Sequence, residues 1–307
     1  MSKAATADSY SKNMLHQKVF RTIICILFCI IALLPFVLLV MNATRDSESI
    51  KAGVSLIPST HLIENWKNLM IKQNGMQITL QKAIINSATI TIPGTFLSVY
   101  FSSLTAYGIH VYDFKFKKFA WAFIMAVMMV PSQISIIGFY RFMLDLKLID
   151  TYVPLIIPTI AAPTVVFFMK QYMESTLSLE MIEAARIDGA GEYKILARVV
   201  IPLSKPMMAT ISLMVGLGYW NDWTNSLYYI TDESLFSIQA ILNTIITNIQ
   251  FLTSGQSSAA SAVDVSKLPS VSIRMAIAVI GVLPVLCIYP FFQKYFVKGI
   301  VVGGVKG

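Results

Sequence analysis

The chain has 307 residues, of which 56% are hydrophobic and 13% charged, with a formal net charge of +8. Soluble domains usually carry about 25% charged residues, so this composition indicates a membrane protein and argues against a soluble enzyme. The basic residues flank apolar runs, which predicts a topology signal and no nucleic-acid partner. The three cysteines, Cys25, Cys29 and Cys287, lie inside apolar runs, so no disulfide framework is expected.

Six apolar runs are long enough, or nearly so, to cross a bilayer as a helix of about 20 residues. We expect these spans at 22–41, 83–109, 119–140, 152–169, 207–230 and 275–292. The fourth run is short and rich in proline, and the second is long enough to tilt.

A seventh apolar stretch, 236–252, is predicted to be an amphipathic helix outside the bilayer core. The reason is a polar stripe at helical spacing, made of Gln239, Asn243, Thr247 and Gln250. The serine-rich segment that follows, 254–261, is predicted to be a flexible linker.

Charge distribution predicts the orientation, because cytoplasmic segments are richer in Lys and Arg. With the N-terminus inside and six spans, the whole excess of positive charge falls on the inner segments. We therefore expect a cytoplasmic N-terminal segment (1–21), a six-helix transmembrane domain (22–296) and a cytoplasmic tail (297–307). Within the transmembrane domain, the loop 170–206 would be internal and the loop 231–274 external.

The inner loop 170–206 is long and charged for a helix connection. Ser178 is a plausible N-cap of a short helix, and Gly189 can end that helix in a left-handed conformation. A second helix follows, with Ile195 and Val200 on its apolar face, and Pro202 and Pro206 are expected to break it before the fifth span.

Two roles fit such a loop. A short surface helix with acids and small residues suits docking into a groove of a soluble partner. An interfacial helix that only anchors the loop on lipid is the alternative, but such helices carry a Lys-rich face. The helix around Glu183 carries more acid than base, which favours docking.

The stretch 183–206, EAARIDGAGEYKILARVVIPLSKP, resembles the EAA motif of permease subunits of ATP-binding-cassette (ABC) importers. Leu196 departs mildly from the family pattern, which often has an aromatic residue there. The resemblance implies that this helix is the coupling helix, which docks in a cleft of the ATPase subunit. The matching residues expected to couple to the ATPase are Glu183, Ala184, Ala185, Asp188, Gly189, Ala190 and Pro202, with Ile201 completing the pattern.

The resemblance continues over nearly the whole chain. The segments 86–108, 128–140 and 220–223 (WNDW) are similar to helices of the carbohydrate branch related to the maltose importer, and 297–307 is similar to its C-terminal tail. The nearest pattern is the smaller, six-helix partner of such permease pairs. This implies an all-α polytopic membrane protein with the type I ABC importer permease fold, in which the six helices carry a cytoplasmic coupling helix.

The resemblance also implies the assembly. We expect a multi-pass protein of the bacterial cytoplasmic membrane, with both termini cytoplasmic and membrane lipid around it. Its expected partners are a second permease subunit, a dimer of ABC ATPase subunits, an extracellular solute-binding protein and a transported sugar or oligosaccharide. The chain lacks a G-x-x-x-x-G-K-[ST] loop, so it is expected to be a non-catalytic subunit that binds no cofactor, while the ATPase uses ATP and Mg.

Sugars bind to planar polar groups and to aromatic faces. The candidates for the solute path are Ser132, Gln133, Tyr140, Tyr219, Trp220 and Asn221. For each of them, interhelical bonding or interfacial anchoring is the competing role.

Metal binding is not expected, because His16, His61 and His110 show no ligand spacing. Three alternatives remain open: an ABC permease for a non-sugar solute, an ion-coupled secondary transporter and a membrane scaffold. A secondary transporter would need a charged residue deep within a span. The predicted spans contain one charged residue, Asp222, which is expected to be a hydrated residue at a span boundary and no proton carrier.

Overall fold

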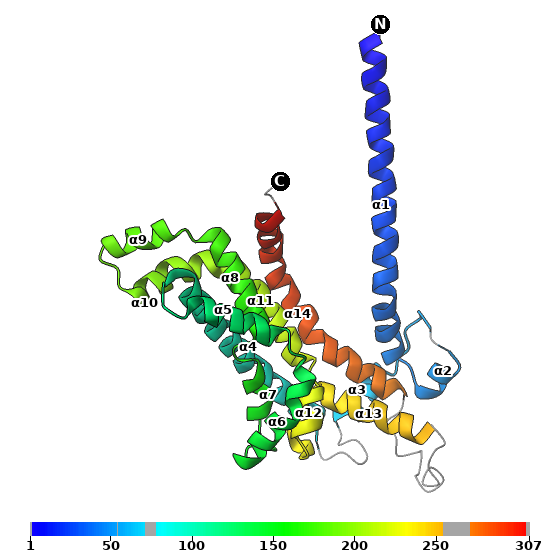
Figure 1. Cartoon of the computed structure of the whole chain (residues 1–307). Coiled ribbons are helices and arrows are strands. Elements are labelled where there is room, and N and C mark those ends of the chain that lie inside the picture. The colour runs from blue at the N-terminus through cyan, green and yellow to red at the C-terminus, as the bar shows by residue number, and fades with distance from the viewer. Residues whose placement is uncertain (1, 54, 71–77, 254–270, 305–307) are drawn as a thin grey trace. The chain divides into compact units, whose positions relative to one another are not determined.

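The computed structural model describes residues 2–53, 55–70, 78–253 and 271–304, and these residues are almost entirely helical (Figure 1). The chain divides into two compact units: Met1–Leu69 with Pro269–Ile280, and Met70–Leu268 with Gly281–Gly307. Among the described residues, 5 helices are long and apolar enough to cross a membrane, or up to 6 if one bent pair forms a single span. The all-α, polytopic fold class predicted from the sequence is confirmed.

The first unit contains α1 (Ser2–Ala43), α2 (Ser47–Lys51) and α3 (Leu62–Met70). The candidate span in α1 covers Gln17–Ala43, which matches the first predicted run, and the helix continues back over the N-terminal segment. The helix α3 packs back against the end of α1, since Asn65 Nδ2 in α3 donates to the carbonyls of Ala43 (2.9 Å) and Arg45 (3.0 Å). The bond to Ala43 occupies a carbonyl in the last turn of α1 that has no partner within the helix, and the bond to Arg45 holds the segment just after it.

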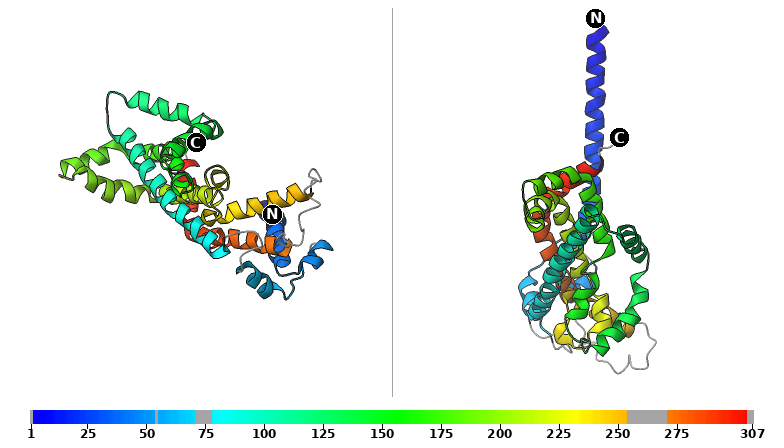
Figure 2. Two further views of the ribbon diagram at one scale, coloured as in Figure 1. Left: turned by 90° about the horizontal axis from the view of Figure 1, so that it is seen from below. Right: turned by 60° about the vertical axis from the view of Figure 1, so that its left-hand side comes forward.

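The second unit is built around α4 (Leu80–Val111), α8 (Pro163–Thr176) and α11 (Ile201–Trp220), which pack side by side (Figure 2). The other elements are α5 (Lys117–Met128), α6 (Ser132–Asp145), α7 (Val153–Ile156), η1 (Ile157–Thr159), α9 (Leu179–Ile187), α10 (Glu192–Ile195), η2 (Leu196–Val200), α12 (Thr224–Tyr229), η3 (Glu233–Leu235) and α13 (Ile238–Thr253). The last helix, α14 (Val271–Gly304), belongs partly to each unit.

Small residues allow α4 to approach its neighbours closely. Ser98, Ser102 and Ala106 are fully buried along one side of α4, and Gly94 is buried on the same helix. Membrane helices associate through such residues because lipid provides no hydrophobic drive between them. A Cβ placed on Gly94 would lie 2.5 Å from Cζ of Tyr219 in α11, so the aromatic ring occupies the space that glycine leaves.

The third predicted span is broken in the structure. The helices Lys117–Met128 and Gln133–Asp145 are bent against each other by 101°. Pro131 stands at the break, with an extended backbone at ψ 129°. Proline lacks an N–H and disfavours helical geometry at the residue before it, which explains the interruption.

A helix at the predicted stretch 236–252 is confirmed as α13, which buries Ile238, Ile241 and Ile245 on one face, whereas its place outside the bilayer core stays a prediction. The serine-rich segment after it lies outside the described residues.

The predicted break at Pro202 and Pro206 is wrong, because one helical segment runs from Glu192 to Trp220. Its turn at Leu196–Val200 is π-helical. A π-turn bonds residues five apart and is accommodated inside α-helices, so the missing N–H of Pro202 is absorbed without a break. The segment ends at Trp220, earlier than the predicted residue 230, and α12 forms a separate short helix.

Candidate coupling site

The helix α9 and the turn after it form one end of the second unit, away from α6 and α12 (Figure 1). Ser178 caps α9, since its Oγ accepts a hydrogen bond from the backbone N–H of Met181 at 3.3 Å. Glu180 lies in the first turn, where the helix dipole favours an acid. Both features were predicted from the sequence and are confirmed.

The C-terminus of α9 is a Schellman motif, which uses the left-handed conformation of Gly189 at φ 77°. The Ala190 N–H donates to the Ala185 carbonyl, and the Gly189 N–H donates to the Arg186 carbonyl, each at 3.0 Å. The predicted role of Gly189 is therefore confirmed, and the chain reverses toward α10 within a few residues.

The two faces of α9 differ sharply. Ile182 is 1% exposed and packs in a core cluster with Leu177 and Ile195. The opposite face is open, with Glu183, Ala184, Asp188 and Gly189 all exposed. Ile187 at the end of α9 is 86% exposed, and Tyr193 in the following helix α10 is 87% exposed. An open face that combines an acid, small residues and apolar side chains is suited to a protein partner.

We call α9, the turn after it and α10 (179–195) the elbow. Glu192 links the elbow to α4 by accepting hydrogen bonds from three side chains. Its Oε1 accepts from Arg186 Nε at 2.8 Å, and its Oε2 accepts from the hydroxyls of Tyr112 (2.6 Å) and Tyr107 (3.1 Å). The Arg186 guanidinium also stands 5.6 Å from the Tyr112 ring centroid. The hydrogen bond to Glu192 raises the pKa of Arg186, while burial, followed by the bond to Glu192, raises the pKa of Tyr112. We call these four residues the Glu192 clamp.

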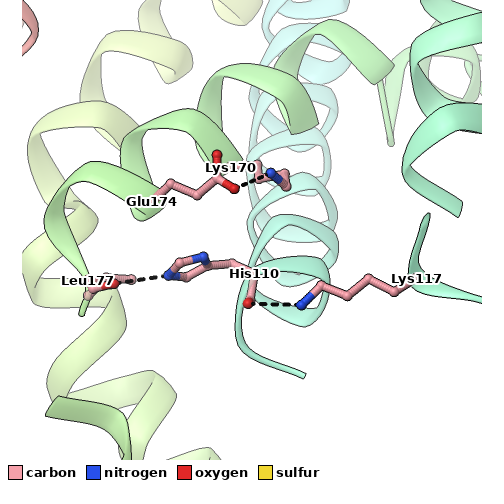
Figure 3. Close-up of polar contacts among 5 residues, drawn as sticks. All are labelled: His110, Lys117, Lys170, Glu174 and Leu177. Carbon is pink, nitrogen blue, oxygen red and sulfur yellow. Dashed lines mark hydrogen bonds and ion pairs between the residues drawn. The ribbon is translucent and has the colours of Figure 1, made fainter. Parts of the chain in front are cut away.

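A second set of contacts joins the N-terminal side of α9 to α4 and α5 (Figure 3). His110 Nε2 lies 3.0 Å from the Leu177 carbonyl oxygen, and because a carbonyl only accepts, this nitrogen carries the proton. Lys117 Nζ donates to the His110 carbonyl at 3.4 Å. Leu177 directly precedes the capping Ser178, so this set fixes where α9 begins.

Lys170 is a charged residue that the predicted span boundaries did not include. The fourth candidate span runs to Thr176, beyond the predicted end at 169, so Lys170 lies inside it at 8% exposure. Buried charges need a partner. Lys170 pairs with Glu174 one turn along α8 (Figure 3). Its Nζ also lies 4.3 Å from the centroid of the Trp121 ring. Both contacts balance the charge of Lys170 within the protein, which is typical of a structural lysine.

The solute-path candidates fall into two groups. Tyr219 and Trp220 are buried and bond to backbone carbonyls, Tyr219 Oη to Ile156 at 2.7 Å and Trp220 Nε1 to Gly281 at 2.8 Å. Both side chains therefore hold helices together. Asn221 is exposed and accepts from Gln239 Nε2 at 3.4 Å.

The remaining candidates come from α6. Gln133 is exposed, and Tyr140 is 38% exposed and stacked on Tyr229 of α12 with ring centroids 6.4 Å apart. The side chain of Ser132 lies outside the described residues. A role for these residues in the solute path stays a prediction.

Glu192 with Tyr107 and Tyr112 was missed from the sequence. The two tyrosines are separated from Glu192 by 85 and 80 positions, and only the packing of α4 on the elbow brings them together. The available signal was a pair of tyrosines at the C-terminal end of one span and an acid shortly after the DGA turn.

Residues 98–302 match the model of a family described as the binding-protein-dependent transport system inner membrane component. The chain belongs to this family. It is thus a membrane component of an importer that works with a solute-binding protein. The arabinooligosaccharides transport system permease protein AraQ of Halalkalibacterium halodurans is 32% identical over 284 residues, which cover 90% of this chain and 92% of the relative.

Two further proteins are similar to this chain over almost its whole length. The sn-glycerol-3-phosphate transport system permease protein UgpE of Brucella suis is 26% identical over 91% of this chain and 94% of the relative. A chain in the crystal structure of a bacterial ABC transporter involved in the import of the acidic polysaccharide alginate is 23% identical and aligns over 93% of this chain and 98% of its own length. Its TM-score of 0.74 shows that the two chains share the ABC importer permease fold.

The clamp yields a prediction for the Glu192→Gln permease. The amide removes the negative charge that balances Arg186 and turns a donor toward the tyrosine hydroxyls, so the elbow should open more often. Because these hydrogen bonds are made to a charged group that is partly exposed to solvent, we expect a moderate effect, in which backbone hydrogen exchange in 179–195 accelerates by roughly tenfold.

The matched pair is Tyr112→Phe and Tyr193→Phe, measured in the same way by mass spectrometry. Tyr112 donates to Glu192, whereas Tyr193 is 87% exposed and has no side-chain hydrogen bond among the described residues. Faster exchange in the Tyr112 variant alone is expected. Equal exchange in Glu192→Gln and the parent chain would show that the clamp does not hold the elbow.

Proposed function

We propose that this chain is one of the two permease subunits of an ABC importer for an oligosaccharide, and that α9 is the point where an ATPase subunit drives it. The observation that supports contact with the ATPase is a hydrogen-bonded elbow whose outer face is open. It is capped at both ends, clamped to α4 and exposes Glu183, Ile187 and Tyr193. The resemblance of 183–206 to the EAA motif supports the same role.

Alternating access follows from this arrangement. When the two ATPase subunits close on ATP and Mg, they would carry α9 with them. The covalent connections to α8 and α11 and the Glu192 clamp to α4 would then rearrange the three core helices together. The chain itself would bind no nucleotide. This mechanism needs the elbow in the cytoplasm, hence cytoplasmic N- and C-termini and a solute-binding protein on the outer side.

The oligosaccharide class is supported by the names of the similar proteins, which give arabinooligosaccharides for one and alginate for another. The glycerol-3-phosphate relative favours a second candidate, an ABC permease for a small phosphorylated solute. Uptake of labelled arabinooligosaccharide and of labelled glycerol-3-phosphate by the same reconstituted importer separates the two classes. Uptake of the phosphate ester alone would overturn the oligosaccharide assignment.

The ATPase contact is tested with Glu183→Lys. Reversing an exposed charge at a docking face places like charges opposite each other, so ATPase co-purifying with the permease should fall by about tenfold. The control is Glu64→Lys, a reversal on the exposed surface of α3. Unchanged co-purification and uptake in the Glu183 variant would remove α9 from the ATPase interface.

A further inference from the structure

The turn between α4 and α5 has a surface that the coupling role does not use. Its sequence over 112–119, YDFKFKKF, alternates aromatic and basic side chains, and we call it the basic–aromatic turn. Phe114, Phe116 and Phe119 are 42%, 65% and 68% exposed. Lys115 and Lys118 are exposed, and neither forms an ion pair within the part of the chain that the structure describes.

The basic–aromatic turn lies where an apolar surface begins. Phe119 stacks on Phe123 along α5 with ring centroids 6.3 Å apart, and both rings are more than half exposed. The helix α5 is half of the bent pair that is apolar enough to span a membrane. Aromatic rings concentrate at the membrane–water boundary, and lysine stems lie along apolar surface while the ammonium reaches the headgroups.

We propose that the basic–aromatic turn binds anionic phospholipids, with the ammonium groups of Lys115 and Lys118 on the lipid phosphates and the phenylalanine rings among the acyl chains. Phosphatidylglycerol has this chemistry. The exposed rings favour lipid over an acidic protein surface, because they continue into the exposed apolar surface of α5, a helix of the bent pair that is apolar enough to span a membrane. The proposed ATPase groove that receives the acidic α9 would also be basic and would repel these lysines.

Bound lipid would act on the coupling elbow through two hydrogen bonds. Lys117, in the same turn, donates to the His110 carbonyl, and the His110 ring bonds the Leu177 carbonyl next to the N-cap of α9 (Figure 3). Tyr112 at the start of the turn belongs to the Glu192 clamp. A lipid that orders the turn therefore orders both supports of α9. This step rests on the proposed function, whereas lipid binding itself does not.

The test uses the assembled importer in phosphatidylcholine nanodiscs that contain a photoactivatable phosphatidylglycerol. We expect cross-links to map to 112–119, and the yield there to fall about tenfold in Lys115→Gln/Lys118→Gln, since each lysine near an anionic surface contributes severalfold. The matched control, Lys67→Gln/Lys82→Gln, removes the same charge from exposed positions elsewhere and should keep the yield.

Two results would overturn the proposal. One is an equal cross-linking yield in the Lys115/Lys118 variant and the parent, with the ATPase still bound. The other is the same equal yield together with loss of co-purifying ATPase, which would assign the turn to the protein interface. Neither readout requires transport, so failure of the coupling role would leave a positive lipid result standing.

Discussion

We expect a Gly189→Pro permease to insert into the membrane normally but to lose coupled uptake by more than about tenfold, because proline cannot adopt the turn after α9. Gly189 has φ 77°, whereas proline is fixed near −65°, and the substitution also removes the N–H that donates to Arg186. The chain after Asp188 must then leave in another direction. Glu192 would move away from Arg186, and the clamp to α4 would open.

Measurement of solute-stimulated ATP hydrolysis and of uptake in proteoliposomes checks this result. Gly189→Ala should give a milder defect, since an L-residue in the left-handed region costs about 1–2 kcal/mol. Gly191→Ala is the matched control, because Gly191 has a negative φ of −69° and nothing lies within 4 Å of an added Cβ. Normal coupling in Gly189→Pro, or equal defects in both alanine variants, would contradict the role of the turn.

The second large effect is expected from Gly94→Ala, which should lower the stability of the helix bundle by about 1–3 kcal/mol, as overpacking of a close-packed core does. The added Cβ would lie 2.5 Å from Cζ and 2.8 Å from both Cε atoms of Tyr219. The ring cannot swing aside cheaply, because its hydroxyl bonds the Ile156 carbonyl at 2.7 Å and the side chain is 7% exposed. Thermal unfolding of the detergent-solubilised complex, followed by tryptophan fluorescence, measures the loss.

A rescue experiment identifies the cause. Tyr219→Leu should restore part of the stability of Gly94→Ala by removing the clashing ring, whereas Tyr219→Phe keeps the ring and should not. Gly108→Ala is the control in the same helix, since nothing lies within 4 Å of its added Cβ, and we expect no loss there. Additive effects of Gly94→Ala and Tyr219→Leu would show that the two positions do not interact.

The features that could be predicted from the sequence are those fixed by local chemistry. Helix spans follow from long apolar runs, and the ends of α9 follow from a serine that accepts a backbone N–H and a glycine that turns left-handed. The docking face of α9 was predicted from its acids and small residues, and its exposure agrees with that prediction.

The features that could not be predicted depend on the rest of the fold. Proline breaks a helix in general, yet Pro202 lies in a helix that continues because a π-turn precedes it, while Pro131 does interrupt the chain. Residue identity also does not show where Tyr219 and Trp220 point: they could line a solute path or join helices, and only packing shows that both are buried against backbone carbonyls. Glu192 meets its tyrosines for the same reason.

The open surface of α9 and α10 has a consequence for the amount of this subunit in the cell. Ile187 and Tyr193, at 86% and 87% exposure, would be covered only when the other components are present. A copy made in excess would expose this apolar surface to chaperones and quality-control proteases. Degradation of unassembled copies would therefore match the amount of this subunit to that of the other components. The same exposed surface would distinguish an unassembled copy from an assembled one.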